Sequence, residues 1–172
     1  MKFFAVLTSL VASASAIDVY LHTDNDCGSS WFRCNSINPN ICCGVTPTFT
    51  NYGSVAARGI PTFWNVQLRG YRNGVCNSLQ TIDPNWGSSF ICSRANGYFT
   101  YTGVGYNFYG RKRAESEPAE ECQRPNVLGL PDGTEYDLTG LSDDELNALA
   151  TSATNATTIA DLPHSLQARQ IL

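Results

Sequence analysis

Short apolar alternations dominate the chain between Ile17 and Tyr109, and no window in this stretch keeps the period of a helix. Clear alternations occur in Val19-Tyr20-Leu21, Phe63-Trp64-Asn65-Val66-Gln67-Leu68 and Tyr98-Phe99-Thr100-Tyr101. Turn-forming dipeptides separate them, as in Asn73-Gly74, Asp83-Pro84 and Asn96-Gly97. Short strands between such turns are typical of a small β-sandwich or barrel, so the pattern predicts an all-β domain over residues 17–110.

A different pattern follows Cys122, where one stretch has the signature of an amphipathic helix. Ser142 and Glu145 have the spacing of a capping box. Four leucines fall near one face of this helix, at Leu138, Leu141, Leu146 and Leu149. We therefore predict one helix near residues 142–153. The rest of the segment 114–172 is too polar and too short to build its own core, and we expect it to be largely flexible.

An internal duplication is indicated when the domain is shifted by 49 positions against itself. The shift superposes Cys27 on Cys76, Cys43 on Cys92, Tyr52 on Tyr101 and Val55 on Val104. The repeated order of cysteine and aromatic residues predicts two similar β units. In that arrangement Cys76 would pair with Cys92, and the four earlier cysteines would pair among themselves. The sequence alone leaves fifteen connectivities open.

Six of the seven cysteines lie before residue 113, and Cys122 follows it. The six are Cys27, Cys34, Cys42, Cys43, Cys76 and Cys92. In a small exported domain they are best interpreted as three disulfides rather than a metal site, because only His22 accompanies them. Adjacent Cys42 and Cys43 would point to opposite faces of a strand, so we expect them to bond different partners. Cys122 could pair with another chain or keep its thiol.

The N-terminus has the form of an export signal. Lys2 precedes an apolar run, and the small residues Ala14-Ser15-Ala16 follow it, which predicts a signal peptide over residues 1–16 and an extracellular protein. No later segment approaches the roughly 20 apolar residues that a membrane helix needs. Asn155 stands in the chain's one glycosylation sequon, which predicts a surface position during secretion.

Charge changes sharply at Arg111-Lys112-Arg113, the only place where basic residues adjoin. Residues 17–113 carry eight cations and four acids, whereas residues 114–172 carry two cations and eleven acids. Lys112-Arg113 resembles the cleavage site of a kexin-like protease. We therefore predict that processing there separates a basic six-cysteine domain from an acidic pro-segment or tail. An uncut, solvated linker is the alternative.

Three stretches resemble motifs of the βγ-crystallin family. "VYLHTDNDCGSSWFRC" resembles the first hairpin of that family's Greek key, "FTNYGSVAAR" resembles its later part, and "FWNVQLRGYRNGVC" begins a second copy. The resemblance covers residues 17–110 and extends to small cysteine-rich secreted fungal proteins, some of them killer-toxin-like or antimicrobial. It implies a disulfide-stapled β-sandwich of two Greek-key units and an effector-like or toxin-like role.

The same resemblance raises the question of a calcium site. The nearest matches are Thr50-Asn51-Tyr52-Gly53-Ser54-Val55 and Pro84-Asn85-Trp86-Gly87-Ser88-Ser89. Each lacks an acidic ligand and one required position, although calcium prefers carboxylate oxygens. We interpret both stretches as turns, and we expect no metal and no cofactor.

One cluster has the residue types that a hydrolase needs. His22, Asp24 and Asp26 alternate at a strand end, so they could share a face and serve a secreted glycan-active enzyme. The same stretch is also turn chemistry, because Asp and Asn side chains bond to nearby backbone. We favour the turn, and therefore expect no enzyme.

The tryptophans offer a second kind of site. Trp31, Trp64 and Trp86 stand beside turn residues, where an exposed ring could stack on a sugar or enter a membrane interface. Core packing is the alternative for at least two of them. The arginines are scattered without a basic stripe, so we expect no nucleic-acid partner.

The sequence as a whole favours a secreted protein that binds or disturbs a target surface. Membrane lipid, cell-wall glycan and a host protein all remain open as the target. A non-catalytic adhesion protein of the cell wall is a further alternative.

Overall fold

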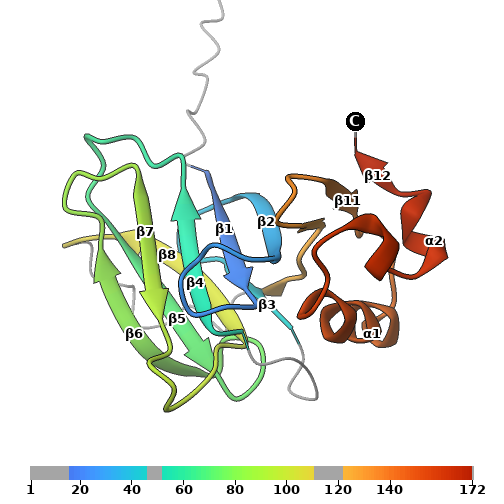
Figure 1. Ribbon diagram of the computed structural model, residues 1–172. Helices are drawn as coiled ribbons and strands as arrows, with labels where there is room; N and C mark the ends of the chain where they lie inside the picture. The colour runs from blue at the N-terminus through green and yellow to red at the C-terminus, as the bar shows by residue number, and fades with distance from the viewer. Residues whose placement is uncertain (1–15, 46–51, 111–121, 172) are drawn as a thin grey trace, which may run out of the picture.

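The computed structural model describes residues 16–45, 52–110 and 122–171, which form two β-sheets with a small helical part beside them (Figure 1). The first eight strands are β1 (Ile17–His22), β2 (Trp31–Ile37), β3 (Cys42–Gly44), β4 (Ser54–Arg58), β5 (Val66–Arg72), β6 (Ser78–Pro84), β7 (Phe90–Arg94) and β8 (Gly103–Phe108). The later elements are β9 (Cys122–Gln123), β10 (Val127–Gly129), β11 (Glu135–Asp137), α1 (Asp143–Ala153), the 3-10 helix η1 (Ile159–Asp161), α2 (His164–Gln167) and β12 (Gln170–Ile171).

Some predicted features lie outside the described residues. They are the signal peptide up to residue 15, the dibasic site at residues 111–113, and Thr50-Asn51 of the first calcium-like stretch. Within the three described ranges, no helix combines the length and the apolar character needed to cross a membrane.

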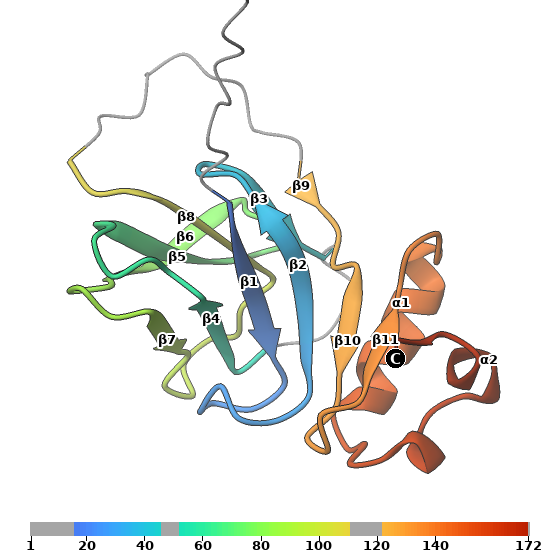
Figure 2. The same cartoon turned by 90° about the horizontal axis from the view of Figure 1, so that it is seen from above.

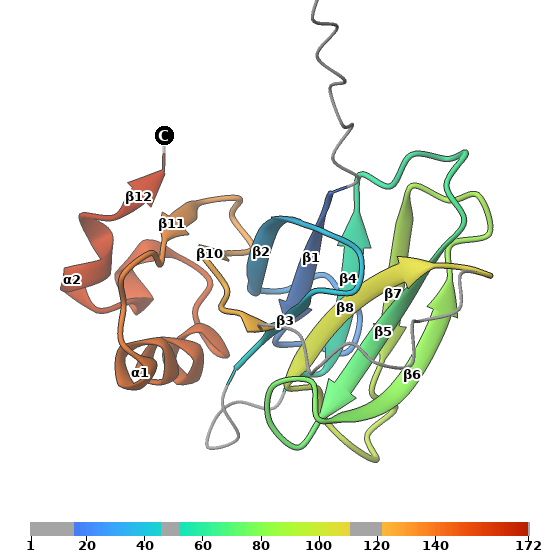
Figure 3. The same ribbon diagram turned by 180° about the vertical axis from the view of Figure 1, so that it is seen from behind.

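The first eight strands form two Greek-key units that exchange their third strands. The first sheet has the order β12-β11-β10-β2-β1-β4-β7, and the second has the order β6-β5-β8-β3-β9. In each unit the fourth strand returns to lie beside the first, as a Greek key requires. However, β3 joins the sheet of the second unit and β7 joins the sheet of the first. Figure 3 shows the second sheet from its outer side, with β8 beside β5. The predicted all-β sandwich is confirmed.

The core lies between the two sheets and follows from the alternation of their strands. Val19 and Leu21 of β1, and Val66 and Leu68 of β5, are all fully buried in one apolar cluster. In β5 the residue between them, Gln67, is partly exposed, whereas in β1 the intervening Tyr20 is buried in a second, smaller apolar cluster. Burying side chains of this kind stabilises a fold by roughly 1.5 to 3 kcal/mol each. This inner layer holds the two units together.

The predicted duplication appears in space as a contact between equivalent residues. Tyr52 lies just before β4 and Tyr101 lies just before β8, and the two form an antiparallel β-bridge. The Tyr101 N–H donates to the Tyr52 carbonyl at 2.8 Å, and the Tyr52 N–H donates back to the Tyr101 carbonyl at 3.1 Å. Both side chains are fully buried. A reciprocal contact between matching positions indicates an approximate two-fold relation between the units.

The six cysteines of the β domain form three disulfides, as predicted. The bonds are Cys27–Cys92, Cys34–Cys43 and Cys42–Cys76. Cys42 and Cys43 have different partners, also as predicted, because neighbouring residues of a strand face opposite ways. Removing a native disulfide from a small secreted domain typically costs about 2 to 5 kcal/mol, so these bonds contribute much of the stability.

The predicted pairing of Cys76 with Cys92 is wrong, and the strand exchange gives the physical reason. Cys76 follows β5, but the third strand that reaches its hairpin is β3, which carries Cys42. Cys27 follows β1 and meets Cys92 on β7 in the same way. The pairing of the four earlier cysteines among themselves therefore fails except for Cys34–Cys43. Two disulfides join one unit to the other.

The C-terminal part of the chain continues the first sheet. The predicted helix is confirmed as α1, and Ser142 caps it by accepting a hydrogen bond from the Glu145 N–H. The expectation of a largely flexible segment is wrong for residues 122–171, because β10 pairs with β2 and then with β11. Figure 2 shows this part beside β2. Eleven of its buried apolar residues belong to the same cluster as the sandwich core: Leu128, Leu130, Tyr136, Leu138, Leu146, Leu149, Ala150, Ala153, Ala156, Leu162 and Leu166.

Among the residues that the structure describes, an ion pair joins the basic part of the chain to the acidic part. Arg33 of β2 donates to both carboxylate oxygens of Glu135 on β11, at 3.1 and 2.8 Å. The Arg33 guanidinium also lies over the Trp31 ring, with 4.9 Å between its carbon and the ring centroid. The Arg33 side chain is 15% exposed and the Glu135 side chain is 30% exposed, so solvent screens this ion pair less than it screens a surface pair.

We expect Glu135→Gln to lower the free energy of unfolding by about 1 to 3 kcal/mol, because it leaves Arg33 without its counter-charge in a half-buried position. Denaturant unfolding followed by fluorescence measures the change. Asp132→Asn is the matched control, since Asp132 is exposed and asparagine can keep its bond from the Thr134 N–H. The control should change stability by no more than about 0.5 kcal/mol. Equal losses in the two variants would contradict a role for the pair.

Candidate functional site

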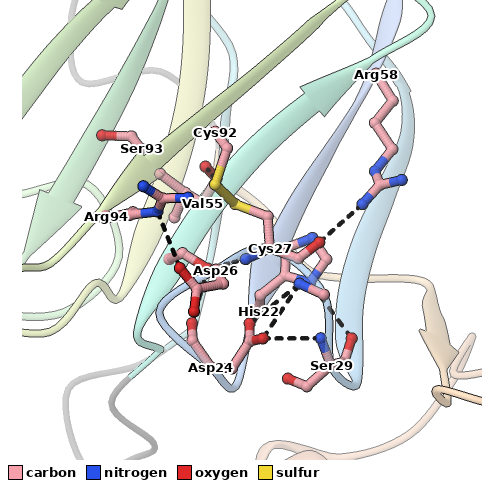
Figure 4. The surroundings of a disulfide bond; sticks show 12 residues. His22, Asp24, Asp26, Cys27, Ser29, Val55, Arg58, Cys92, Ser93 and Arg94 are labelled. Carbon is pink, nitrogen blue, oxygen red and sulfur yellow. Dashed lines mark hydrogen bonds and ion pairs between the residues drawn. A yellow bond between two sulfur atoms is a disulfide. The ribbon is translucent and has the colours of Figure 1, made fainter.

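The turn after β1 carries the acidic members of the predicted cluster of His22, Asp24 and Asp26 (Figure 4). The Asp24 carboxylate accepts a hydrogen bond from the Ser29 N–H at 3.1 Å. Asp26 instead forms an exposed ion pair with Arg94 at 3.1 Å. The two carboxylates therefore have separate partners and brace a turn, which is the interpretation that we favoured.

His22 itself is fully buried at the end of β1. Its Nδ1 lies 3.4 Å from the Ser29 carbonyl oxygen, and its Nε2 has no hydrogen-bond partner among the described residues. Burial, followed by the positive charge of Arg58, lowers the pKa of His22 from 6.5 to about 4. The ring is therefore neutral at neutral pH. An imidazole without solvent contact cannot touch a substrate, so the structure does not assemble these three residues as a hydrolytic site.

The three tryptophans have different surroundings. Trp31 is half-buried, with its ring edge-on to Tyr20 at 5.2 Å between centroids. Trp64 is also half-buried and packs against Phe108 at 5.1 Å. Trp86 is 87% exposed. Two of the candidate binding residues therefore serve mainly in packing, and one is displayed to solvent.

Trp86 has an exposed aromatic neighbour in Tyr109, and the segment that carries the exposed Phe63 lies against the Trp86 turn; we call Phe63, Trp86 and Tyr109 the aromatic surface. The exposed fractions of the three side chains are 82, 87 and 64%. Trp86 and Tyr109 line one small hollow of about 60 Å³ together with Asn65, Val66, Pro84 and Asn85. The Thr62 carbonyl oxygen would lie 3.8 Å from a Cβ at Gly87, which places the segment before Phe63 against the Trp86 turn. The hollow is too small to enclose a ligand, so these rings offer a surface.

Asn85 holds the Trp86 turn in place. Its buried amide accepts from the Val66 N–H at 3.1 Å and donates to the carbonyls of Trp64 at 2.8 Å and Ser88 at 3.1 Å. A buried amide with three such bonds fixes the backbone on both sides of it. The second calcium-like stretch is therefore a turn, as we interpreted it, because the Asn85 side chain is used by the chain's own backbone.

The backbone conformation of Trp86 also helps to expose its side chain. Trp86 has φ +48° and Gly87 has φ +77°, both in the left-handed region. That conformation costs a non-glycine residue roughly 1 to 2 kcal/mol. The turn holds Trp86 in a strained conformation while its large apolar side chain gains little burial. Strained backbone conformations are frequent at functional sites, and the exposed indole makes Trp86 a candidate binding residue.

Sequence reasoning found Trp86 but missed Phe63, Tyr109 and the supporting Asn85. Turn residues beside Trp86 were the signal, and Phe63 and Tyr109 also stand at the ends of apolar alternations. Nothing in the local pattern shows that these positions, distant in the chain, meet at one end of the sandwich. Of the other predicted sites, Asn155 is exposed just after α1, in agreement with the sequon.

Comparison with known proteins gives one match. Residues 18–126 match a family model, ARB_05566_N, which is described as an N-terminal domain. The match covers both Greek-key units and β9, and it ends just before β10. No curated protein matches the chain, and no solved structure matches it.

We expect the folded protein to lose stability as the pH falls from about 6.5 to about 4. The unfolded chain binds a proton at His22 below its ordinary pKa of 6.5, whereas the folded protein binds it only near 4. The neutral form of His22 therefore makes its full contribution to the free energy of unfolding above pH 6.5. Below pH 6.5 that contribution declines, and at pH 4 it is smaller by about 2 to 3 kcal/mol.

Denaturant unfolding at several pH values measures this loss, with His22→Gln as the comparison. The variant cannot titrate at this position, so its stability should fall less steeply between pH 6.5 and 4. The carboxylates are the same in both proteins, so the comparison isolates the contribution of His22. Parallel curves for the two proteins would show that His22 is not the group responsible.

Proposed function

Because the chain belongs to the ARB_05566_N family through residues 18–126, a stretch that includes Phe63, Trp86 and Tyr109, we propose that this family domain binds a target surface through the aromatic surface. The observation that carries the proposal is the Trp86 indole, 87% exposed on a turn that the Asn85 amide fixes. A ring that is held out before it meets its target loses little conformational freedom on binding.

Energetics support a binding role over a structural one. A tryptophan buries a large apolar area when it meets a partner, and its stacked contacts are worth about 0.5 to 1.5 kcal/mol beyond that area. In this fold Trp86 gains almost none of that stabilisation, while Trp31 and Trp64 gain much of it. Trp31 and Trp64 therefore contribute to packing within the fold, whereas Trp86 is available to contact an outside partner.

The composition of the hollow favours a neutral carbohydrate as the target. Asn65, Asn85, Pro84 and Val66 line it beside the two rings, and no charged side chain of the described residues does so. Aromatic rings stack on the apolar faces of sugars, and the amide of the exposed Asn65 can complete the hydrogen bonds, whereas the Asn85 amide is used by the backbone of its own turn. A membrane surface is usually recognised with lysine or arginine beside the aromatic rings. We therefore place a neutral cell-wall glycan ahead of lipid or a host protein.

The wider setting of the proposal is a secreted fungal protein with an effector-like or toxin-like role. The signal-like N-terminus and the three disulfides support export to an oxidising compartment. Two successive Greek-key units support the βγ-crystallin resemblance. Processing after Lys112-Arg113 and glycosylation at Asn155 belong to the same proposal, and intact-mass analysis of the secreted protein tests both.

We expect Trp86→Ala to weaken binding to an insoluble neutral wall polysaccharide about 3- to 10-fold, the loss of one stacked ring. Co-sedimentation with chitin and with β-glucan measures the affinity. Tyr98→Ala is the matched control, because Tyr98 is 93% exposed on the turn after β7, away from the aromatic surface.

The control should bind like the unaltered protein, and both variants should keep the same thermal transition. Loss of binding in Tyr98→Ala alone, or equal binding in all three proteins, would overturn the proposal. Sedimentation with neutral phospholipid vesicles that depends on Trp86, without binding to either polysaccharide, would move the target to a membrane.

A further inference from the structure

Three cysteine sulfurs gather on the outer side of the second sheet. The Sγ atoms of Cys42, Cys76 and Cys122 all lie within 4.8 Å of one another. Cys42 and Cys76 form a disulfide, and Cys122 carries a thiol. As long as that disulfide stands, the group cannot offer three thiolates to a metal. It places a nucleophilic sulfur beside a bond that such a sulfur can attack.

The strands that carry these sulfurs are in register. β9 pairs with β3 in parallel, and Cys122 is the direct partner of Cys42. Direct partners in neighbouring strands point to the same face, and such strands lie about 4.8 Å apart. That spacing falls within the range of roughly 4.4 to 6.8 Å between Cα atoms that disulfides require. A Cys42–Cys122 bond is therefore compatible with the observed backbone.

The sulfurs also open to solvent through a hollow of about 120 Å³. Its lining includes Arg69, Tyr71, Asn77 and the three cysteines. Gly105, opposite Cys42 in the neighbouring strand β8, has no side chain to fill it, and a Cβ there would meet the Ile41 carbonyl oxygen at 2.8 Å. Cys122 is exposed. A thiol must be accessible in order to react, and this position gives that access.

We propose that Cys122 and the Cys42–Cys76 disulfide form a thiol–disulfide exchange site. The Cys122 thiolate attacks the Sγ of Cys42, the Cys42–Cys76 bond breaks, and Cys76 leaves as a thiolate that takes up a proton. One disulfide and one thiol are present before and after the step, so no outside oxidant or reductant is consumed. The reverse step, attack by Cys76, restores the first arrangement.

The exchange changes which parts of the molecule are joined. In one arrangement the bond ties β3 to the hairpin after β5, and in the other it ties β3 to β9, where the C-terminal part begins. The second arrangement would hold residues 122–171 covalently to the first Greek-key unit. The site does not involve the aromatic surface, so it stands or fails independently of the proposed function.

Trapping with N-ethylmaleimide tests the exchange in the complete, unaltered protein. The protein is kept at pH 8 without added thiol, quenched in acid, labelled near pH 6 under denaturing conditions and mapped by non-reducing mass spectrometry of peptides. We expect the label to be divided between Cys122 and Cys76, with at least a tenth on Cys76, together with a Cys42–Cys122 peptide. Cys27–Cys92 and Cys34–Cys43 serve as internal controls and should stay unlabelled.

Two variants sharpen the test. Cys122→Ser should carry no label on Cys76, because the attacking sulfur is gone. Cys76→Ser should form an intramolecular Cys42–Cys122 disulfide on air oxidation, since the two sulfurs are then both thiols in bonding reach. A label confined to Cys122 in the unaltered protein would overturn the proposal. So would a Cys76→Ser protein that keeps both thiols or becomes a disulfide-linked dimer.

Discussion

The exchange of β3 and β7 between the two sheets is the constraint on which the rest of the fold depends. Each Greek-key unit lacks a complete sheet until the other supplies its third strand. The disulfides from Cys27 to Cys92 and from Cys76 to Cys42 fasten the two exchanged strands to the opposite hairpins. Since both units contribute to both sheets, neither can open without uncovering the common core.

The C-terminal part depends on the edge that this arrangement leaves. β2 would be the outer strand of the first sheet, with unpaired backbone groups, if β10 did not cover it. Arg33 of β2 pairs with Glu135, which belongs to the acidic segment after residue 113. The border at residues 111–113 is thus one of composition, while the described parts on its two sides share a sheet and a core.

Local signals in the sequence were sufficient where the structure is local. The capping box at Ser142 and Glu145 located α1, and alternation located β1 and the start of β5, because both signals depend on near neighbours. The third alternation, Tyr98-Phe99-Thr100-Tyr101, lies in the connection before β8 and forms no strand. The duplication was visible because Tyr52 and Tyr101 kept their identity. The predicted disulfide pairing was wrong because it depends on which strand crosses to which sheet.

The strands β10, β11 and β12 were missed because segments of two or three residues form no sequence pattern, and their pairing begins at β2. Phe63 and Tyr109 were missed as site residues because exposure is set by distant chain segments.

The bridge between Tyr52 and Tyr101 has an evolutionary consequence. Reciprocal bonds between equivalent positions are the contacts that two identical subunits make across a two-fold axis. A single Greek-key unit that extends its third strand in this way could pair that strand with the sheet of a second copy of itself. The present domain has the architecture of such a strand-swapped homodimer joined into one chain. Fusion of that kind frees the two halves to diverge, and here only the second half carries the exposed tryptophan.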